Sequence, residues 1–229
     1  IRDRLGSASL WRDFPELLVE KTGWGVLAYS RAGYGQSELV ELPRPLDYMT
    51  LEAQDVISDV LSAAGIEQAV LFGHSDGATI ASIYAGTIND DRLNGLIVMA
   101  PHYFTESAGL REIAKAKQAY DEGDLKFKMS KYHRDPDTTF RGWNDSWLHP
   151  DFESWNVADV LNGVNVPVLA IQGAEDQYGT LRQIQEIEKR CKTPVTLLVL
   201  DGCRHSPHLD QPSMVLDAVN PYCGGLAVE

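Results

Sequence analysis

The fold class is decided by the stretch Leu71-Phe72-Gly73-His74-Ser75-Asp76-Gly77-Ala78, which joins an apolar run to a helical pattern. The apolar run predicts a buried strand that ends at this stretch, and the small residues after it predict a closely packed helix. A sharp turn from strand to helix lifts a serine hydroxyl clear of a sheet, and crowding there requires a glycine two residues to either side. Ser75 is therefore the candidate nucleophile. The backbone N–H of Asp76, at the start of the helix, is a candidate oxyanion donor.

Short apolar runs recur along the chain, with helical patterns between them. The runs are continuous rather than alternating, which is typical of parallel strands covered on both faces. We expect strands at residues 24–29, 69–72, 96–100, 166–171 and 195–200, and helices at 51–64, 75–87 and 181–190. This alternation predicts an α/β fold whose mostly parallel sheet is flanked by helices.

The interval between Pro101 and Asn165 carries no strand signal, and it is far longer than an ordinary loop. Its helical patterns at 110–120 and 125–132 are followed by five aromatic residues. One interpretation is an extra helical layer with its own core, and another is a cap over a pocket; both can hold together. We expect residues 1–103 to form the first part of the core, 104–161 a helical cap, and 162–229 the second part.

A serine hydroxyl needs a base, usually a histidine that a carboxylate holds in place. In hydrolases of this architecture the chain order is serine, acid, histidine, each after a strand. The run that ends at Ile171 is followed by the acidic pair Glu175-Asp176. The run that ends at Leu200 is followed by a loop that contains His205 and His208. Both loops lie where that order requires them.

Four segments together resemble the α/β-hydrolase superfamily, in its small-esterase and C–C hydrolase branch. They are residues 29–37 (YSRAGYGQS), the nucleophile elbow 73–77, the acid loop Gly173-x-x-Asp176, and the histidine loop 203–212 (CRHSPHLDQP). The resemblance implies that Ser75 is the nucleophile, Asp176 the acid and His205 the base. The Gly-x-x-Asp spacing favours Asp176 over Glu175. His208 is then expected to be a packing or supporting residue.

The chain departs from the family pattern near its start. The family usually carries a His-Gly pair that supplies a second oxyanion N–H, and here the corresponding residues 2–7 read RDRLGS. By position, the backbone N–H of Arg4 or Leu5 would serve instead. The family's first three strands, which precede this loop, have no counterpart in the sequence. Their absence predicts either a gap in the sheet or direct pairing of 24–29 with 69–72.

The side chain of Asp76 poses an electrostatic question, because a carboxylate beside the nucleophile would oppose an oxyanion. It could turn away, toward an arginine or the helix face, but the favoured interpretation is a solvated acid at the helix start, stabilised by the helix dipole. Cys203, His205 and His208 could be read as metal ligands, but no fourth ligand is evident and a metal would occupy the base. No metal and no cofactor are expected.

The composition limits the partners. The 229 residues carry a formal net charge of −13, which argues against nucleic acid and anionic membranes as partners. No apolar run approaches the length that spans a bilayer. Three scattered cysteines favour a reduced, cytoplasmic setting. The sequence gives no prediction of the oligomeric state.

The expected activity is hydrolysis of a small-to-medium carboxylic ester through an acyl-enzyme intermediate, on a small-molecule substrate. His102, Trp143 and Trp147 are the candidate substrate-binding residues. Alternatives of the same fold are a C–C bond hydrolase, a thioesterase and a perhydrolase. An alternative of another class is a non-catalytic ligand-binding module.

Overall fold

The computed structural model describes Ile1 and residues 6–226, and its centre is a parallel sheet. Within these residues the sheet has four strands in the order β1-β2-β3-β4. The strands are β1 (Ala69–His74), β2 (Leu93–Met99), β3 (Val168–Gly173) and β4 (Val195–Leu200). Val98 lies opposite both Gly73 and Ala170, so three neighbouring strands are in register at this level. The predicted α/β class is confirmed, and so are four of the five predicted strands.

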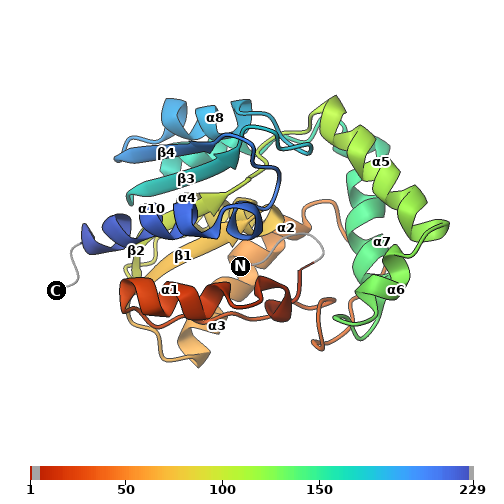
Figure 1. The fold of residues 1–229 in the computed structure, drawn as a ribbon, viewed down its shortest axis with the longest axis horizontal. Coiled ribbons are helices and arrows are strands. Elements are labelled where there is room, and N and C mark those ends of the chain that lie inside the picture. Colours follow the sequence, from red (N-terminus) through yellow and green to blue (C-terminus); the bar gives the residue numbers. More distant parts are fainter. Residues whose placement is uncertain (2–5, 227–229) are drawn as a thin grey trace.

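Helices cover both faces of the sheet (Figure 1). On one face lie α1 (Phe14–Thr22) and α10 (Pro212–Gly224), whose Phe14 and Val215 share an apolar cluster with Ile97 and Ile171. The other face is covered by α3 (Ile57–Ala63), α4 (Asp76–Thr87) and α8 (Arg182–Arg190). The predicted helix 51–64 is found as α2 (Tyr48–Leu51), a π-helical turn (Glu52–Val56) and α3. Three helices were not predicted from the sequence: α1, α10 and the short α9 (Pro207–Asp210).

Residues 104–161, which we call the helical insertion, form a lobe at one end of the sheet (Figure 1). The insertion contains α5 (Ser107–Asp121), α6 (Leu125–Met129), α7 (Pro136–Trp147) and a 3-10 turn at Pro150–Phe152; a second 3-10 turn, Ala158–Gly163, begins inside the insertion and ends beyond it. The buried apolar residues of the insertion belong to the same apolar cluster as α3, α4 and α8, and within it the rings of Tyr120 and Phe140 stack with centroids 3.9 Å apart. The insertion is also hydrogen-bonded to the loop that contains Gly33 and Gly35. Thr139 Oγ1 donates to Gly33 O at 2.7 Å, and Gly35 N–H donates to His133 Nδ1 at 3.0 Å.

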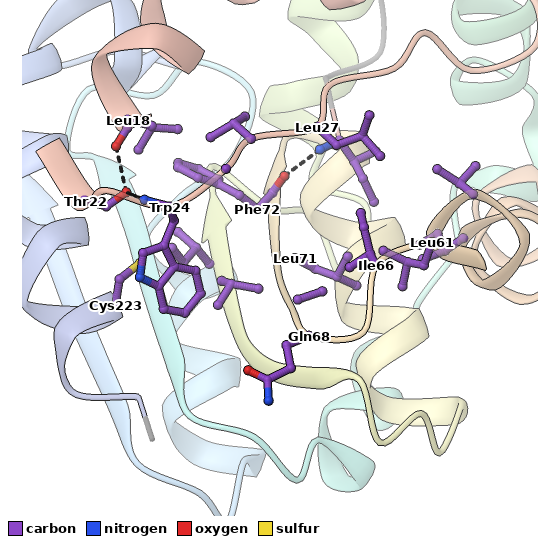
Figure 2. A pocket seen from close by; sticks show the side chains of 18 of the residues that line it. Leu18, Thr22, Trp24, Leu27, Leu61, Ile66, Gln68, Leu71, Phe72 and Cys223 are labelled. Atoms are coloured by element: carbon purple, nitrogen blue, oxygen red, sulfur yellow. Dashed lines mark hydrogen bonds between the residues drawn. The ribbon is translucent and has the colours of Figure 1, made fainter. Parts of the chain in front are cut away.

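The strand predicted at Trp24–Tyr29 was wrong: the segment has no regular secondary structure and pairs with no strand of the sheet. An apolar pocket of about 190 Å³ separates it from the outer edge of β1, and Trp24, Leu27, Leu71 and Phe72 are among the lining residues (Figure 2). Paired strands must lie about 4.8 Å apart, so a segment held across a pocket cannot join the ladder. Of the two outcomes expected from the sequence, the structure shows the gap.

One residue does bond to the outer edge of β1. The amino group of Ile1 donates to Phe72 O at 2.5 Å, and His74 N–H donates to Ile1 O at 3.0 Å. The two bonds go to Phe72 and His74, the residues before and after Gly73. This is the hydrogen-bond pattern of a parallel ladder. Ile1 therefore occupies the position beside Gly73, immediately below the turn that carries Ser75.

Candidate active site

Ser75 stands at a strained turn between β1 and α4. Its backbone has φ 55° and ψ −124°, a conformation that side-chain-bearing residues rarely adopt and that costs on the order of 1–3 kcal/mol. The turn is tight enough that a Cβ on Gly73 would lie 2.3 Å from Gly77 O and 2.5 Å from the backbone of Ala78. Only glycine fits at position 73, which is the physical reason for the first glycine of the Gly-x-Ser-x-Gly motif.

The acid loop follows the end of β3. Asp176 accepts hydrogen bonds from Gln172 Nε2 at 2.8 Å and from the backbone N–H of Tyr178 at 2.8 Å. Its side chain is fully buried, whereas Glu175 is exposed. Of the two acidic residues that the sequence placed in this loop, the structure turns Asp176 inward.

The histidine loop follows the end of β4 and packs tightly on the acid loop. A Cβ on Gly173 would lie 2.2 Å from Arg204 O, and Glu175 N–H donates to Cys203 O at 2.9 Å. This contact fixes the spacing of the two loops, so that His205 faces Asp176 across the junction.

A continuous chain of hydrogen bonds links the three loops. His205 Nδ1 lies 2.9 Å and 2.8 Å from the two carboxylate oxygens of Asp176, and His205 Nε2 lies 3.0 Å from Ser75 Oγ. Because a carboxylate can only accept, Nδ1 carries the proton and Nε2 is left to accept from the serine hydroxyl. This arrangement allows His205 to take a proton from Ser75.

The electrostatics keep Asp176 ionised. Burial by itself raises the pKa of the Asp176 carboxyl, but the charge of His205 and the hydrogen bonds from His205 and Tyr178 N–H outweigh burial and lower the pKa below its ordinary value. The charged carboxylate can hold the imidazole in the tautomer that accepts a proton from Ser75.

Aromatic rings surround the imidazole of His205. The ring of His102 stacks over it at 5.7 Å, and Tyr178 meets it edge-on at 4.9 Å. Trp147 in turn lies 5.3 Å from His102. In addition, His74 Nε2 donates to the backbone carbonyl oxygen of His205 at 2.7 Å. The imidazole is thus held by contacts on several sides.

The other predicted residues have different surroundings. Trp143 is fully buried and packs edge-on against Phe140, and its contact with a substrate stays a prediction. His208 packs against Trp11 and His74 at 4.9 Å each, in agreement with the packing interpretation. Arg4 lies outside the described residues.

Asp76 is fully buried, so the favoured interpretation of a solvated acid was wrong. Its carboxylate turns to Tyr48, whose hydroxyl donates to Asp76 Oδ2. Three residues of the site were not predicted from the sequence: Tyr48, Gln172 and Tyr178. The last two flank Asp176 closely in the chain and could have been proposed from that proximity, but nothing in the spacing of Tyr48 connects it to Ser75.

In Ile1 and residues 6–226, no group of three or more His, Cys, Asp or Glu side chains has an arrangement that could hold a metal ion. Over the same residues, every helix is too short or too polar to cross a lipid bilayer.

The chain is similar in structure to several solved hydrolases. It matches an esterase from Rhodococcus sp. ECU1013 (TM-score 0.72, 15% identity, covering 99% of this chain and 90% of that one). It also matches a proline iminopeptidase from Mycobacterium smegmatis (TM-score 0.76, 19% identity, covering 98% of this chain and 87% of that one). A third match is the 2-hydroxy-6-oxo-6-phenylhexa-2,4-dienoate hydrolase from Rhodococcus sp. strain RHA1 (TM-score 0.76, 18% identity, covering 97% of this chain and 86% of that one). At such identities these likenesses show the fold and not the substrate.

A search of curated proteins finds no significant match. The sequence profile of the alpha/beta hydrolase family, in contrast, matches residues 5–218. This match covers nearly the whole chain and agrees with the parallel sheet and with the solved structures of the same fold. The chain therefore belongs to the alpha/beta hydrolase family.

Proposed function

We propose that this chain is a serine hydrolase that cleaves small-to-medium carboxylic esters through an acyl-enzyme intermediate. The observation that carries the proposal is the unbroken hydrogen-bond chain from Ser75 Oγ through His205 to Asp176, with links of 2.8–3.0 Å. Three residues from three loops converge in the geometry that serine activation needs.

In the proposed mechanism, Ser75 Oγ attacks the ester carbonyl while His205 Nε2 takes its proton. Asp176 holds the imidazole in the required tautomer and stabilises its positive charge. The same proton then passes to the leaving alkoxide, and the acyl group remains on Ser75. A water molecule, deprotonated by His205, attacks the acyl-enzyme and releases the acid.

The tetrahedral oxyanion forms beside the N-terminus of α4. We assign its first donor to the backbone N–H of Asp76, the first residue of that helix. For the second donor we keep the backbone N–H of Arg4. His102 and Trp147 lie on the side of His205 toward the helical insertion, and we propose that they contact the substrate there.

Covalent labelling tests the proposal directly. A fluorophosphonate should label wild-type protein at Ser75, as located by peptide mass spectrometry, and should not label the folded Ser75→Ala variant. The matched control is Ser82→Ala, which removes another fully buried serine hydroxyl from α4 and should leave labelling intact. Failure of folded wild-type protein to react would refute the activated serine and favour the ligand-binding module.

The bond type is tested separately with p-nitrophenyl esters of increasing acyl length. We expect hydrolysis that depends on Ser75 and that declines for the longest chains. Labelling without hydrolysis of any ester in the series would keep the nucleophile and reject the ester assignment.

A further inference from the structure

A buried hydrogen-bond chain runs from the helical insertion to the residue that follows the nucleophile. Trp147 Nε1 donates to Tyr48 Oη at 3.1 Å, and Tyr48 Oη donates to the carboxylate of Asp76. All three side chains are shielded from water, with exposed fractions of 4%, 4% and 0%. The three residues come from α7, α2 and the first turn of α4, so the chain crosses from the insertion to the core.

The carboxylate at this position needs compensation. Asp76 supplies the proposed first oxyanion donor from its own backbone, so its side-chain charge lies close to the place where negative charge develops. Two like charges in a water-excluded site repel each other strongly, because the effective dielectric constant there is low. An uncompensated Asp76 carboxylate would oppose the reaction.

Compensation comes from two buried groups. Burial, together with the charge of Asp76, raises the pKa of Tyr48 well above its ordinary value, so the hydroxyl keeps its proton and remains a donor. The guanidinium of Arg31 is 3% exposed and lies over the Tyr34 ring at 4.5 Å. Burial opposes its charge, but the attraction of Tyr34, Glu52 and Asp76 outweighs burial and raises the pKa of Arg31.

Trp147 connects this network to the triad from the other side. Its indole N–H is donated to Tyr48, and its ring meets His102, which stacks on His205. A single side chain of the helical insertion therefore contacts both the group that holds Asp76 and the ring that covers the candidate base.

We propose that Tyr48 is a positioning residue for the reaction: its hydroxyl holds the Asp76 carboxylate and disperses part of its charge through the hydrogen bond, and its bond from Trp147 ties the oxyanion site to the helical insertion. This inference rests on the proposed function, with Ser75 as nucleophile. Tyr48 contacts no reacting atom. Its effect is exerted through Asp76, so it should depend on the charge of that residue.

A double-mutant cycle tests this dependence. Tyr48→Phe removes the hydroxyl but keeps the ring, and we expect kcat for a p-nitrophenyl ester to fall about 10–100-fold with KM changed less than about 3-fold. Asp76→Asn removes the charge and keeps the backbone N–H. In that background, Tyr48→Phe should lower kcat less than about 3-fold, because no charge is left to compensate.

The chain offers a closely matched control. Tyr84, on the same helix as Asp76, is also fully buried and also donates to a carboxylate, that of Asp90, which an arginine neutralises. Tyr84→Phe should therefore cost similar stability in urea unfolding but change kcat less than about 3-fold.

Equal losses of kcat from Tyr48→Phe in wild-type protein and in the Asp76→Asn background would overturn the inference and leave Tyr48 a packing residue. If Tyr48→Phe does not fold, Trp147→Phe replaces it, and its loss of kcat should be several-fold smaller in the Asp76→Asn background. Wild-type protein that neither labels nor hydrolyses esters would refute the proposed function, and the positioning role with it. If wild-type protein is active but the effects of Tyr48→Phe and Asp76→Asn on kcat are additive, only the positioning role is refuted and the proposed function stands.

Discussion

The packing of the nucleophile turn makes a sharp prediction for Gly73→Ala. A Cβ at this position would lie 2.3 Å from Gly77 O, whereas a carbon and an oxygen in contact lie about 3.3 Å apart. Backbone must therefore move by about 1 Å, since neither Gly77 O nor Ala78 N belongs to a flexible side chain. We expect a loss of about 3 kcal/mol or more in the free energy of unfolding, at the upper end of overpacking effects. A shift of about 1 Å in Ser75 should also slow labelling by about 10²-fold.

Urea unfolding and the rate of fluorophosphonate labelling measure the two effects. Gly25→Ala is the matched control, because a Cβ there would meet nothing within 4 Å. It should change the free energy of unfolding by less than about 0.5 kcal/mol and leave labelling unchanged. A Gly73→Ala protein as stable and as reactive as Gly25→Ala would refute the argument that crowding at the turn selects glycine.

Three further predictions concern the triad and the sheet. Asp176→Asn should lower kcat by roughly 10³–10⁴-fold. Because the pKa of Asp176 is lowered in the folded state, the stability that its carboxylate contributes is present above the unfolded pKa of about 3.9 and is lost as pH falls through the folded pKa. The difference in free energy of unfolding between wild type and variant, measured in urea, should therefore shrink below about pH 4. Tyr222→Phe removes a hydroxyl that donates to Pro167 O at 2.8 Å and accepts from Leu96 N–H at 2.9 Å, so it should cost about 1–2 kcal/mol of stability in urea without changing kcat. Ser75→Gly should unfold at a higher temperature than Ser75→Ala, because glycine alone relieves the φ of 55°; the reverse order in calorimetry would argue against strain at the turn.

The parts of the fold that the sequence predicted are those fixed by local pattern. The runs that became β2 and β3 are buried almost throughout, and those that became the outer strands β1 and β4 are partly exposed but still apolar, so continuous apolar composition identifies all four. The loop after each strand then had to reach the same edge of the sheet, and this is why Ser75, Asp176 and His205 could be expected to meet.

The parts that the sequence could not predict depend on distance rather than on pattern. Trp24–Tyr29 is as apolar as a strand, but its pairing depends on how far it lies from β1. Trp143 and Trp147 are both buried aromatic residues of α7, and only their neighbours differ: Phe140 for the first, Tyr48 and His102 for the second. The partner of Asp76 is a tyrosine from a different helix, which no spacing rule connects to it.

The pocket beside Trp24 has a practical consequence for ligand discovery (Figure 2). The residues that line the pocket do not include Ser75, Asp176 or His205, although they include Phe72 of β1, the strand that leads to Ser75. An apolar compound bound there would raise the melting temperature by mass action and leave ester turnover unaltered. Thermal-shift screens therefore need a second readout, and quenching of Trp24 emission without inhibition would mark such compounds as occupants of this pocket.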